Sequence, residues 1–290
     1  MTDVVYVVGP GDANEELRYS LRSLAAHFPH EKVWIAGHRP SWVSDTVGHI
    51  PASQARSRFQ NSTGNMRAAC EHPEVAEEFV YFNDDFFVME PVDGAPVVHR
   101  GTVDEVAAVT RSSLYRRGGQ ATQLLMKRLG LADNGPLLSY EVHAPMTLGK
   151  ARMLEVLAKG AGLPVLHKRS LYGNYWRLGG EQITDVKVQN RDDGLPPGPF
   201  ASTSDDAFTH GRIGELIREA FPDPCRYEAG HEDTAPQEPA QGPSARPEEP
   251  VADRPATRAP VAEWRAWADS QDTGDHSSMT KAELIEQYGG

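Results

Sequence analysis

The sequence predicts an α/β domain with a largely parallel sheet, followed by a linker and two short helices. Along residues 1–227, short apolar runs typical of buried strands alternate with segments whose apolar residues recur at helical spacing. Residues 228–260 contain almost no large apolar side chain, and residues 261–290 regain a helical pattern. The chain therefore divides into a folded domain (1–227), a disordered linker (228–260) and a short helical tail (261–290).

The first half of the predicted domain begins with a buried strand at Val4–Val8. A helix is expected at Glu15–Phe28, a second strand at Lys32–Ala36 and a further helix at Asn65–His72. The loop Gly9–Asn14 joins the first strand to the first helix, the position at which nucleotides bind in open α/β sheets. Its glycines would let the backbone approach a ligand, although a plain turn explains them equally well.

The second half of the domain contains the strand Phe79–Phe82, which runs into a polar turn. A second apolar strand follows directly from Phe86. Beyond it, helices are expected at Thr122–Leu129 and Thr147–Lys159.

The most informative motif is the polar turn itself, Asn83, Asp84 and Asp85. Four Phe and one Tyr flank it in the two strands. Carboxylates buried between strands are destabilising unless something neutralises them, and a hard divalent cation such as Mg²⁺ or Mn²⁺ is the usual partner. The alternative is a solvated turn made by Asn83 and Asp84, but the aromatic flanks favour a buried site.

The net charge of −12 is unevenly distributed. Residues 228–290 contain 13 acidic and 5 basic residues, whereas residues 1–227 contain 28 acidic and 24 basic residues. The predicted folded domain is thus nearly balanced and shows no sign of a nucleic-acid surface. The acidity belongs to the linker and the tail.

The C-terminal part predicts a docking element rather than a second domain. Seven prolines between residues 236 and 260 favour an extended, unfolded linker. After it, Trp264 and Trp267 lie on one face of a predicted helix. A second short helix begins with the capping-box pair Thr280 and Glu283 and would end at Gly289. Two short helices bury too little surface to be stable alone.

Several classes of protein are not expected. No apolar run reaches the 18 residues that a membrane span needs, and Met1–Val8 lacks the basic start of a signal peptide. Cys70 and Cys225 are the only cysteines, which gives no disulfide framework and is typical of a cytoplasmic protein. The Ala, Arg, Pro and Gly content suggests a bacterial or phage genome, and the oligomeric state is not encoded in any pattern.

Several stretches of the domain resemble the conserved blocks of the Stealth family of sugar-1-phosphate transferases, over roughly residues 3–210. The stretches that resemble the second, third and fourth blocks of this family are, in chain order, Asn14–Leu24, Pro40–Trp42, Phe79–Phe87, Tyr140–Pro145, Lys150, Lys168–Tyr172, Tyr175 and Ser204–Asp206. The first block departs from the family: Val4–Gly11 replaces the usual Trp-Val-Asp-Gly and lacks its acidic residue.

The resemblance implies a glycosyltransferase-like, Rossmann-type fold and a nucleotide-sugar donor, usually a UDP-sugar. It also implies Mg²⁺ or Mn²⁺ as cofactor and a glycan hydroxyl as acceptor. In this chemistry the hydroxyl attacks the β-phosphate of the donor, gains a sugar-1-phosphate and releases UMP. Such reactions depend mainly on positioning and on charge neutralisation.

By resemblance, the metal ligands are Asp84 and Asp85, with Asp205 as a further contributor; Asp85 is also counted as catalytic. The alternative for Asp205 is the start of a helix after Ser-Thr-Ser. His143 matches the His of a His-x-Pro pattern and is the candidate general base, because imidazole titrates near working pH. Without the resemblance, a structural His before a proline turn would be favoured.

The remaining candidates would bind the donor. Arg169 would hold the pyrophosphate with two hydrogen bonds, and Lys150 would bind phosphate. Asn14, Arg18 and Asn83 lie near the proposed nucleotide loop and the acidic turn. The alternatives are a surface cation for Arg169, a helix-start cation for Lys150, and an ion-paired helix stripe for Arg18.

Two other functions stay open. The altered first block leaves room for a conventional metal-dependent glycosyltransferase, which would release the nucleoside diphosphate. The second is a non-catalytic phage or assembly protein, since Thr280–Gly290 resembles the first helix of small interaction modules found in phage proteins. No nucleic-acid partner is expected, because the linker is acidic.

Overall fold

The computed structural model describes residues 2–52, 57–132, 135–163, 165–230, 255, 259–271 and 279–288. It separates into two compact units, Met1–His231 and Glu232–Gly290. The predicted disordered linker therefore lies almost entirely outside the described residues. Glu228, which the sequence assigned to that linker, belongs to the first unit, where it is buried.

The first unit is built on a five-stranded central sheet with the strand order β3-β2-β1-β4-β7. Its first four strands in that order are parallel, and β7 joins the edge antiparallel to β4. The expected α/β fold with a mostly parallel sheet is thus confirmed. The strands are β1 (Asp3–Val8), β2 (Val33–Gly37), β3 (Gly48–Ile50), β4 (Glu78–Asn83) and β7 (Met146–Gly149).

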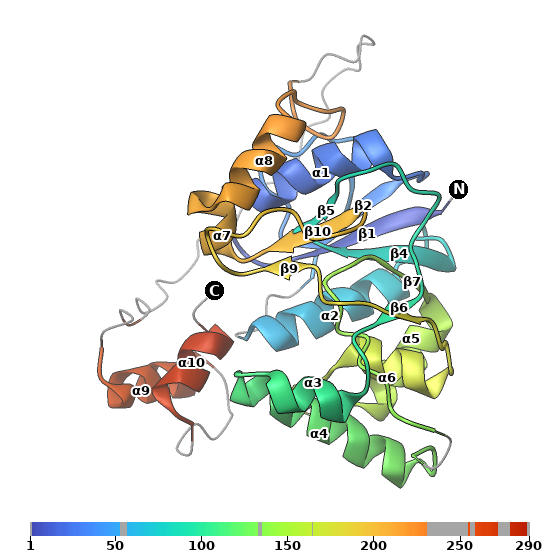
Figure 1. Ribbon diagram of the computed structural model, residues 1–290, viewed down its shortest axis with the longest axis vertical. Coiled ribbons are helices and arrows are strands. Elements are labelled where there is room, and N and C mark those ends of the chain that lie inside the picture. Colours follow the sequence, from blue (N-terminus) through green and yellow to red (C-terminus); the bar gives the residue numbers. More distant parts are fainter. Residues whose placement is uncertain are drawn as a thin grey trace. The chain divides into compact units, whose positions relative to one another are not determined.

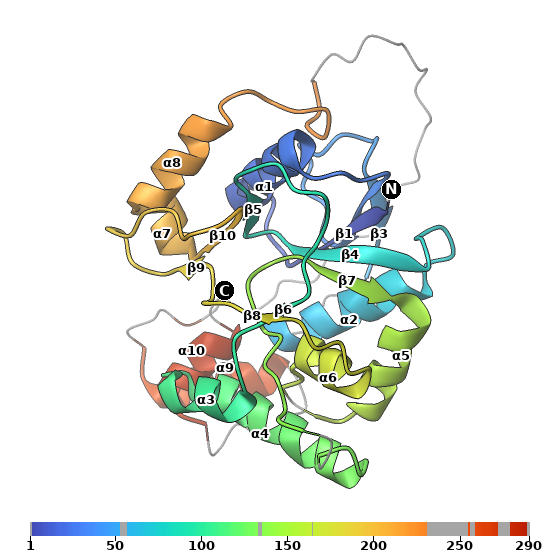
Figure 2. The same cartoon turned by 45° about the vertical axis from the view of Figure 1, so that its right-hand side comes forward.

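Helices cover both faces of this sheet (Figures 1 and 2). The helix α1 (Glu15–His27) lies on one face, where Tyr6 of β1 hydrogen-bonds Ser20 at 2.9 Å. The helices α2 (Arg58–Glu71) and α5 (Lys150–Lys159) lie on the other face. Because both faces are covered, the parallel strands β1, β2 and β4 read as nearly continuous apolar runs.

A second, three-stranded sheet has the order β5-β10-β9 and begins directly after the acidic turn. Its strands are β5 (Phe86–Val88), β9 (Lys187–Val188) and β10 (Phe200–Thr203). Two serines of α1 hold β5 in place: Ser20 donates to the carbonyl of Phe86, and Ser23 accepts the Val88 N–H at 3.0 Å. The acidic turn therefore lies at the seam between the two sheets.

The rest of the first unit surrounds these sheets. It comprises a small two-stranded sheet and five further helices: β6 (Val98–His99), β8 (Glu181–Gln182), α3 (Val103–Val109), α4 (Ser113–Arg128), α6 (Lys168–Tyr175), α7 (Asp205–His210) and α8 (Arg212–Ala220). No helix among the described residues is long and apolar enough to cross a lipid bilayer.

One expected element is wrong in part. The segment Thr147–Lys159 was expected as a single helix, but its first residues form β7, in which Thr147 pairs with Val80 of β4. The helix α5 begins only at Lys150. The helices around Asn65 and Thr122 are present and begin earlier than expected.

The second unit contains α9 (Val261–Gln271) and α10 (Lys281–Tyr288). Trp264 and Trp267 contact each other edge to face at 6.0 Å between ring centroids. The predicted capping box is present, because Thr280 and Glu283 exchange side chain-to-backbone hydrogen bonds. The predicted helix end at Gly289 lies outside the described residues.

Candidate functional site

The acidic turn is at the carboxyl edge of the central sheet, where β4 ends at Asn83 and β5 begins at Phe86. The neighbouring strand β1 ends at the same edge, since Val7 pairs with Asn83 in the parallel ladder. Asp84 is half-buried and Asp85 is only 8% exposed. Two adjacent carboxylates are therefore held largely out of solvent beside the loop that follows β1.

Asp85 is neutralised in part by Lys187 of β9. Its Oδ2 accepts a hydrogen bond from Lys187 Nζ at 2.7 Å and another from Ser202 Oγ at 2.8 Å. Burial raises the pKa of Asp85, but the charges of Lys187 and His143 outweigh burial and bring it below its usual value. Asp85 is thus ionised at neutral pH.

Asp84 is held by Asn14, the residue that caps α1. Asn14 Nδ2 donates to Asp84 Oδ2 at 2.9 Å, while Asn14 Oδ1 accepts the N–H of Leu17 at 3.0 Å. Burial and the adjacent charge of Asp85 raise the pKa of Asp84 to about 6. The donor-binding candidate Asn14 therefore contacts the acidic turn directly.

A third carboxylate, Glu16, lies near the acidic turn and was not among the expected site residues. It is in the first turn of α1 and accepts a hydrogen bond from Thr203 Oγ1 at 2.6 Å. Burial, together with the charge of Asp85, raises the pKa of Glu16 to about 8. In the sequence, Glu16 reads only as an ion partner for Arg18 on the surface of the helix. No local pattern predicts that it is buried.

Asp205 approaches this cluster from the second sheet. It is the first residue of α7 and is exposed, and Ser204 caps that helix by accepting the N–H of Ala207 at 3.3 Å. The helix-start alternative for Asp205 is therefore present in the structure. Its charge still contributes to the raised pKa of Glu16, so Asp205 faces the same region.

The residues of the turn fit a divalent cation by their chemistry. Among the residues that the structure describes, no group of three or more His, Cys, Asp or Glu side chains could hold a metal ion unaided. Mg²⁺, however, is commonly bound by one or two carboxylates together with substrate phosphates. Asp84, Asp85 and Glu16 face a single ammonium, that of Lys187, which leaves the cluster two positive charges short when all three are ionised.

His143 lies close to the acidic turn, with its ring edge-on to Phe86 at 6.4 Å between centroids. Its Nδ1 is 3.0 Å from each carboxylate oxygen of Asp185, and its backbone N–H donates to Asp185 Oδ1 at 3.1 Å. Arg100 Nη1 pairs with the other oxygen of Asp185 at 3.0 Å. Neither Asp185 nor Arg100 was singled out from the sequence.

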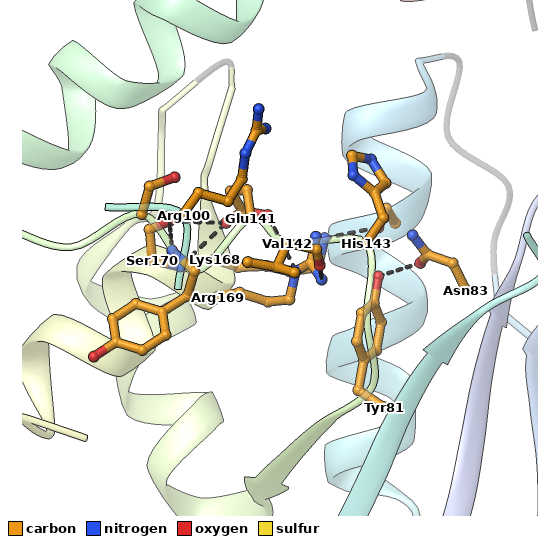
Figure 3. A network of polar contacts seen from close by, with 12 residues as sticks. Tyr81, Asn83, Arg100, Glu141, Val142, His143, Lys168, Arg169 and Ser170 are labelled. Carbon is orange, nitrogen blue, oxygen red and sulfur yellow. Dashed lines mark hydrogen bonds and ion pairs between the residues drawn. The ribbon is translucent and has the colours of Figure 1, made fainter. Parts of the chain in front are cut away.

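Arg169 is placed differently from the expected pyrophosphate clamp. Its guanidinium is buried, with Nε donating to Glu141 Oε2 at 3.1 Å and Nη1 donating to the carbonyl of Val142 (Figure 3). Glu141 also accepts the backbone N–H of Ser170 at 3.1 Å. These contacts fix the segment that leads into His143, which makes Arg169 an anchor of that segment.

Asn83 and Lys168 lie on the side of the turn nearest α2. Tyr81 donates its phenol proton to Asn83 Oδ1, a contact visible in Figure 3. Lys168 Nζ donates to Ser62 Oγ at 2.7 Å, and burial lowers the pKa of Lys168 to about 8. Asn83 is therefore oriented by an aromatic residue of its own strand.

The structure places two other expected donor-binding residues away from such a role. Lys150 Nζ donates to the carbonyls of His72 and Val75 at 2.7 and 2.9 Å, at the opposite edge of the sheet. Arg18 pairs with Glu15 and with Glu228, the latter at 2.8 Å. The ion-paired alternative holds for Arg18, and Lys150 is the first residue of α5, as its helix-start alternative expected.

A buried amide at the same edge was also missed. Asn65 of α2 is fully buried, and its Nδ2 donates to the carbonyl of Val8, the last residue of β1, at 2.9 Å. Its Oδ1 has no hydrogen-bond partner within the described part of the chain. A buried polar atom of this kind is an acceptor available to a ligand.

No family model matches this sequence, and no curated protein matches it. Among solved structures, the chain is similar to the galactosyltransferase LgtC in complex with donor and acceptor sugar analogues, with 11% identity and a TM-score of 0.43 over 81% of this chain and 98% of that one. It is also similar to the apo form of the glycosyltransferase GlyE of Streptococcus pneumoniae TIGR4, with 12% identity and a TM-score of 0.38 over 76% of this chain and 59% of that one.

Proposed function

We propose that this protein is a metal-dependent transferase that moves a sugar-1-phosphate from a nucleotide sugar, such as a UDP-sugar, to a hydroxyl of a glycan, with release of UMP. The observation that carries the proposal is the juxtaposition of His143, held by Asp185, with the buried pair Asp84 and Asp85. Phosphoryl transfer to a hydroxyl needs a base for the hydroxyl proton and a cation that offsets the phosphate charge. The histidine would supply the base, and the carboxylates of the turn would bind the cation.

His143 is the general base of the proposed reaction. Its Nδ1 faces the carboxylate of Asp185, so Nε2 is the nitrogen left to accept a proton. As the acceptor oxygen bonds to the β-phosphorus, its proton passes to Nε2. At the same time the bond breaks between the β-phosphorus and the oxygen that bridges it to the α-phosphorus. The bridging oxygen leaves with the bonding electrons as part of UMP.

Asp84 and Asp85 would hold Mg²⁺ or Mn²⁺, with Asp205, the first residue of α7, as a further contributor. When bound, the cation would offset the negative charge of the donor pyrophosphate. Asn14 keeps Asp84 in place through its amide, and Lys187 would add a positive charge beside Asp85. Asn65 Oδ1 offers a buried acceptor to the donor at the end of β1.

A conventional glycosyltransferase is the second candidate, and one observation favours it. The loop after β1 carries Gly9, Pro10 and Gly11 where a phosphotransferase of the Stealth type has an acidic residue. The carboxylate of Asp12 does not substitute for it, because it accepts hydrogen bonds from the backbone and side chain of Ser41, each at 2.9 Å.

The nucleotide product separates the two candidates. The protein would be incubated with Mg²⁺ or Mn²⁺, a panel of UDP-sugars and mixed glycan acceptors, and UMP would be resolved from UDP by chromatography. We expect metal-dependent UMP that is lost in Asp85→Ala and His143→Ala and retained in Asp223→Ala, an exposed carboxylate after α8. UDP as the product would overturn phosphotransfer in favour of glycosyl transfer.

A further inference from the structure

Asp185 is a half-buried carboxylate whose contacts all belong to the neighbourhood of His143. It lies between β8 and β9, 42 residues from His143 in the chain, and its side chain is 15% exposed. It accepts hydrogen bonds from the ring Nδ1 and the backbone N–H of the same histidine, and it forms an ion pair with Arg100. An ion pair that served only packing would not need to bind both the ring and the main chain of one residue.

We propose that Asp185 is a positioning residue for His143: it fixes the ring and its tautomer so that Nε2 is the proton acceptor beside the acidic turn, and Arg100 keeps Asp185 ionised for this task. The part of this inference that concerns catalysis rests on the function proposed above. The part that concerns the state of the imidazole stands on the geometry alone.

The tautomer follows from what a carboxylate can do. An ionised carboxylate only accepts hydrogen bonds, so the nitrogen 3.0 Å from both of its oxygens must carry a proton. In neutral His143 that proton is on Nδ1, which leaves Nε2 with a free lone pair. The second bond, from the backbone N–H to Asp185 Oδ1, restricts the rotation of the ring relative to its own main chain.

Arg100 is the group that lets a half-buried carboxylate remain charged. Burial would raise the pKa of Asp185, but the charges of His143 and Arg100, with the hydrogen bonds from His143, lower it well below its usual range. The charged groups that face His143 are therefore Asp185, Arg100 and, from the acidic turn, Asp85 with its partner Lys187. Two carboxylates and two cations surround one imidazole.

This arrangement predicts different effects of its two charged partners. Asp185→Asn replaces the carboxylate with an amide that can also donate, so the preference for the Nδ1–H tautomer of His143 should be lost. Arg100→Gln leaves the carboxylate in place, so that tautomer should be kept. Loss of packing alone would not distinguish the two variants in this way.

Nuclear magnetic resonance of ¹⁵N-histidine-labelled full-length protein tests the inference without any substrate. The His143 signals would be assigned with His143→Gln, and the ring shifts followed from pH 5 to 9. We expect the Nδ1–H tautomer in the wild type and in Arg100→Gln, and a mixture of the two neutral tautomers in Asp185→Asn. Asp223→Asn, which changes an exposed carboxylate, should leave the signals unchanged.

The Nε2–H tautomer in the wild type, or an unchanged Nδ1–H tautomer in Asp185→Asn, would overturn the inference. If Asp185→Asn does not fold, the tautomer measured in the wild type alone decides whether the inference holds.

A kinetic measurement links the positioning to the reaction once a substrate is known. We expect kcat of Asp185→Asn to fall by roughly 10- to 1000-fold with little change in KM, within the range that general base catalysis contributes. Unchanged kcat would overturn the catalytic part. If the NMR result holds but no donor is turned over, the positioning stands and the proposed function fails.

Discussion

Two clusters of charged residues next to α1 differ in how their charges are neutralised. At one, Glu228 binds two cations: Arg22 through Nε at 2.7 Å and Arg18 through Nη1 at 2.8 Å. Here the charges balance, because Arg18 also pairs with Glu15, and Arg22 also donates to the carbonyls of Phe221 and Pro222. At the other, Asp85 pairs with Lys187, and burial raises the pKa of Asp84 and of Glu16 above their usual values.

The comparison shows how buried charge distinguishes a structural site from a functional one. The charged groups of the Glu228 cluster are engaged by contacts within the protein, since Arg18 also stacks on the ring of Trp42, with its guanidinium carbon 4.2 Å from the ring centroid. The acidic cluster is open: burial raises the pKa of two of its members instead of being offset by a partner. We therefore expect substitutions in the first cluster to reduce stability and those in the second to reduce activity.

The largest expected effect is on turnover, at Asp85. Asp85→Asn keeps the size of the side chain but removes the charge that would hold a cation, so transfer should fall by roughly 1000-fold. The melting temperature should also fall, because Lys187 loses its carboxylate, but by less than for Glu228→Ala, since the Lys187 side chain is 19% exposed and that of Arg22 only 9%. Product formation and thermal unfolding measured on the same preparation check both statements. A variant that keeps its activity would break the comparison.

The next effect is on stability, at Glu228. Glu228→Ala leaves Arg22 buried without its carboxylate, which should destabilise the first unit by about 3–5 kcal/mol. Urea unfolding measures this directly. Glu74→Ala, which breaks the exposed pair with Lys32, is the matched control and should cost about 0–1 kcal/mol. Equal losses in the two variants would mean that the Glu228 cluster is not a structural anchor.

A smaller, pH-dependent effect is expected at Glu16. Folding raises its pKa from 4.5 to about 8, so its contribution to stability is complete below pH 4.5 and is lost as the pH rises to 8. Glu16→Gln removes this loss, so it should raise the melting temperature more at pH 8.5 than at pH 5. Thermal scans across this range without added metal are the test. A pH-independent effect would contradict the raised pKa.

The smallest effect sharpens the comparison at Lys187. Lys187 and a divalent cation would both neutralise Asp85, so Lys187→Met should increase the affinity for Mn²⁺ by about 10-fold, the equivalent of 1.4 kcal/mol. Titration calorimetry or electron paramagnetic resonance of Mn²⁺ measures this. Lys32→Met, far from the turn in an exposed pair, should leave the affinity unchanged. Weaker Mn²⁺ binding in Lys187→Met would show that the two cations do not compete.

Local sequence patterns predicted the fold well where an element depends on its own residues. The apolar runs of β1, β2 and β4 and the helical spacing of α1 are such cases. The pattern failed at β7, because Thr147 is placed by its pairing with Val80, 67 positions earlier. A short strand followed at once by a helix has no periodicity of its own to reveal it.

The residues of the candidate site also fall into two groups, those that the sequence predicts and those that long-range contacts place. Asp84 and Asp85 were found because their aromatic flanks adjoin them in the chain, and His143 was found by resemblance to a family motif. Asp185 and Lys187 could not be found, because they reach their partners across 42 and 102 residues. Only the pairing of β9 with β10, and of β10 with β5, brings Lys187 to the turn.

The two hydrogen bonds made by the Asn14 side chain restrict which amino acids can occupy this position. Ser, Thr and Asp are also good helix caps, but Ser and Thr have a single oxygen for both bonds and ionised Asp has no donor, whereas Asn14 accepts from Leu17 through Oδ1 and donates to Asp84 through Nδ2. Asp would add another carboxylate to a cluster already rich in them. The backbone of Asn14 has φ 20°, on the positive side that Asn tolerates better than most residues. Among homologues that keep the acidic turn, this position should vary least of all the helix caps in the domain.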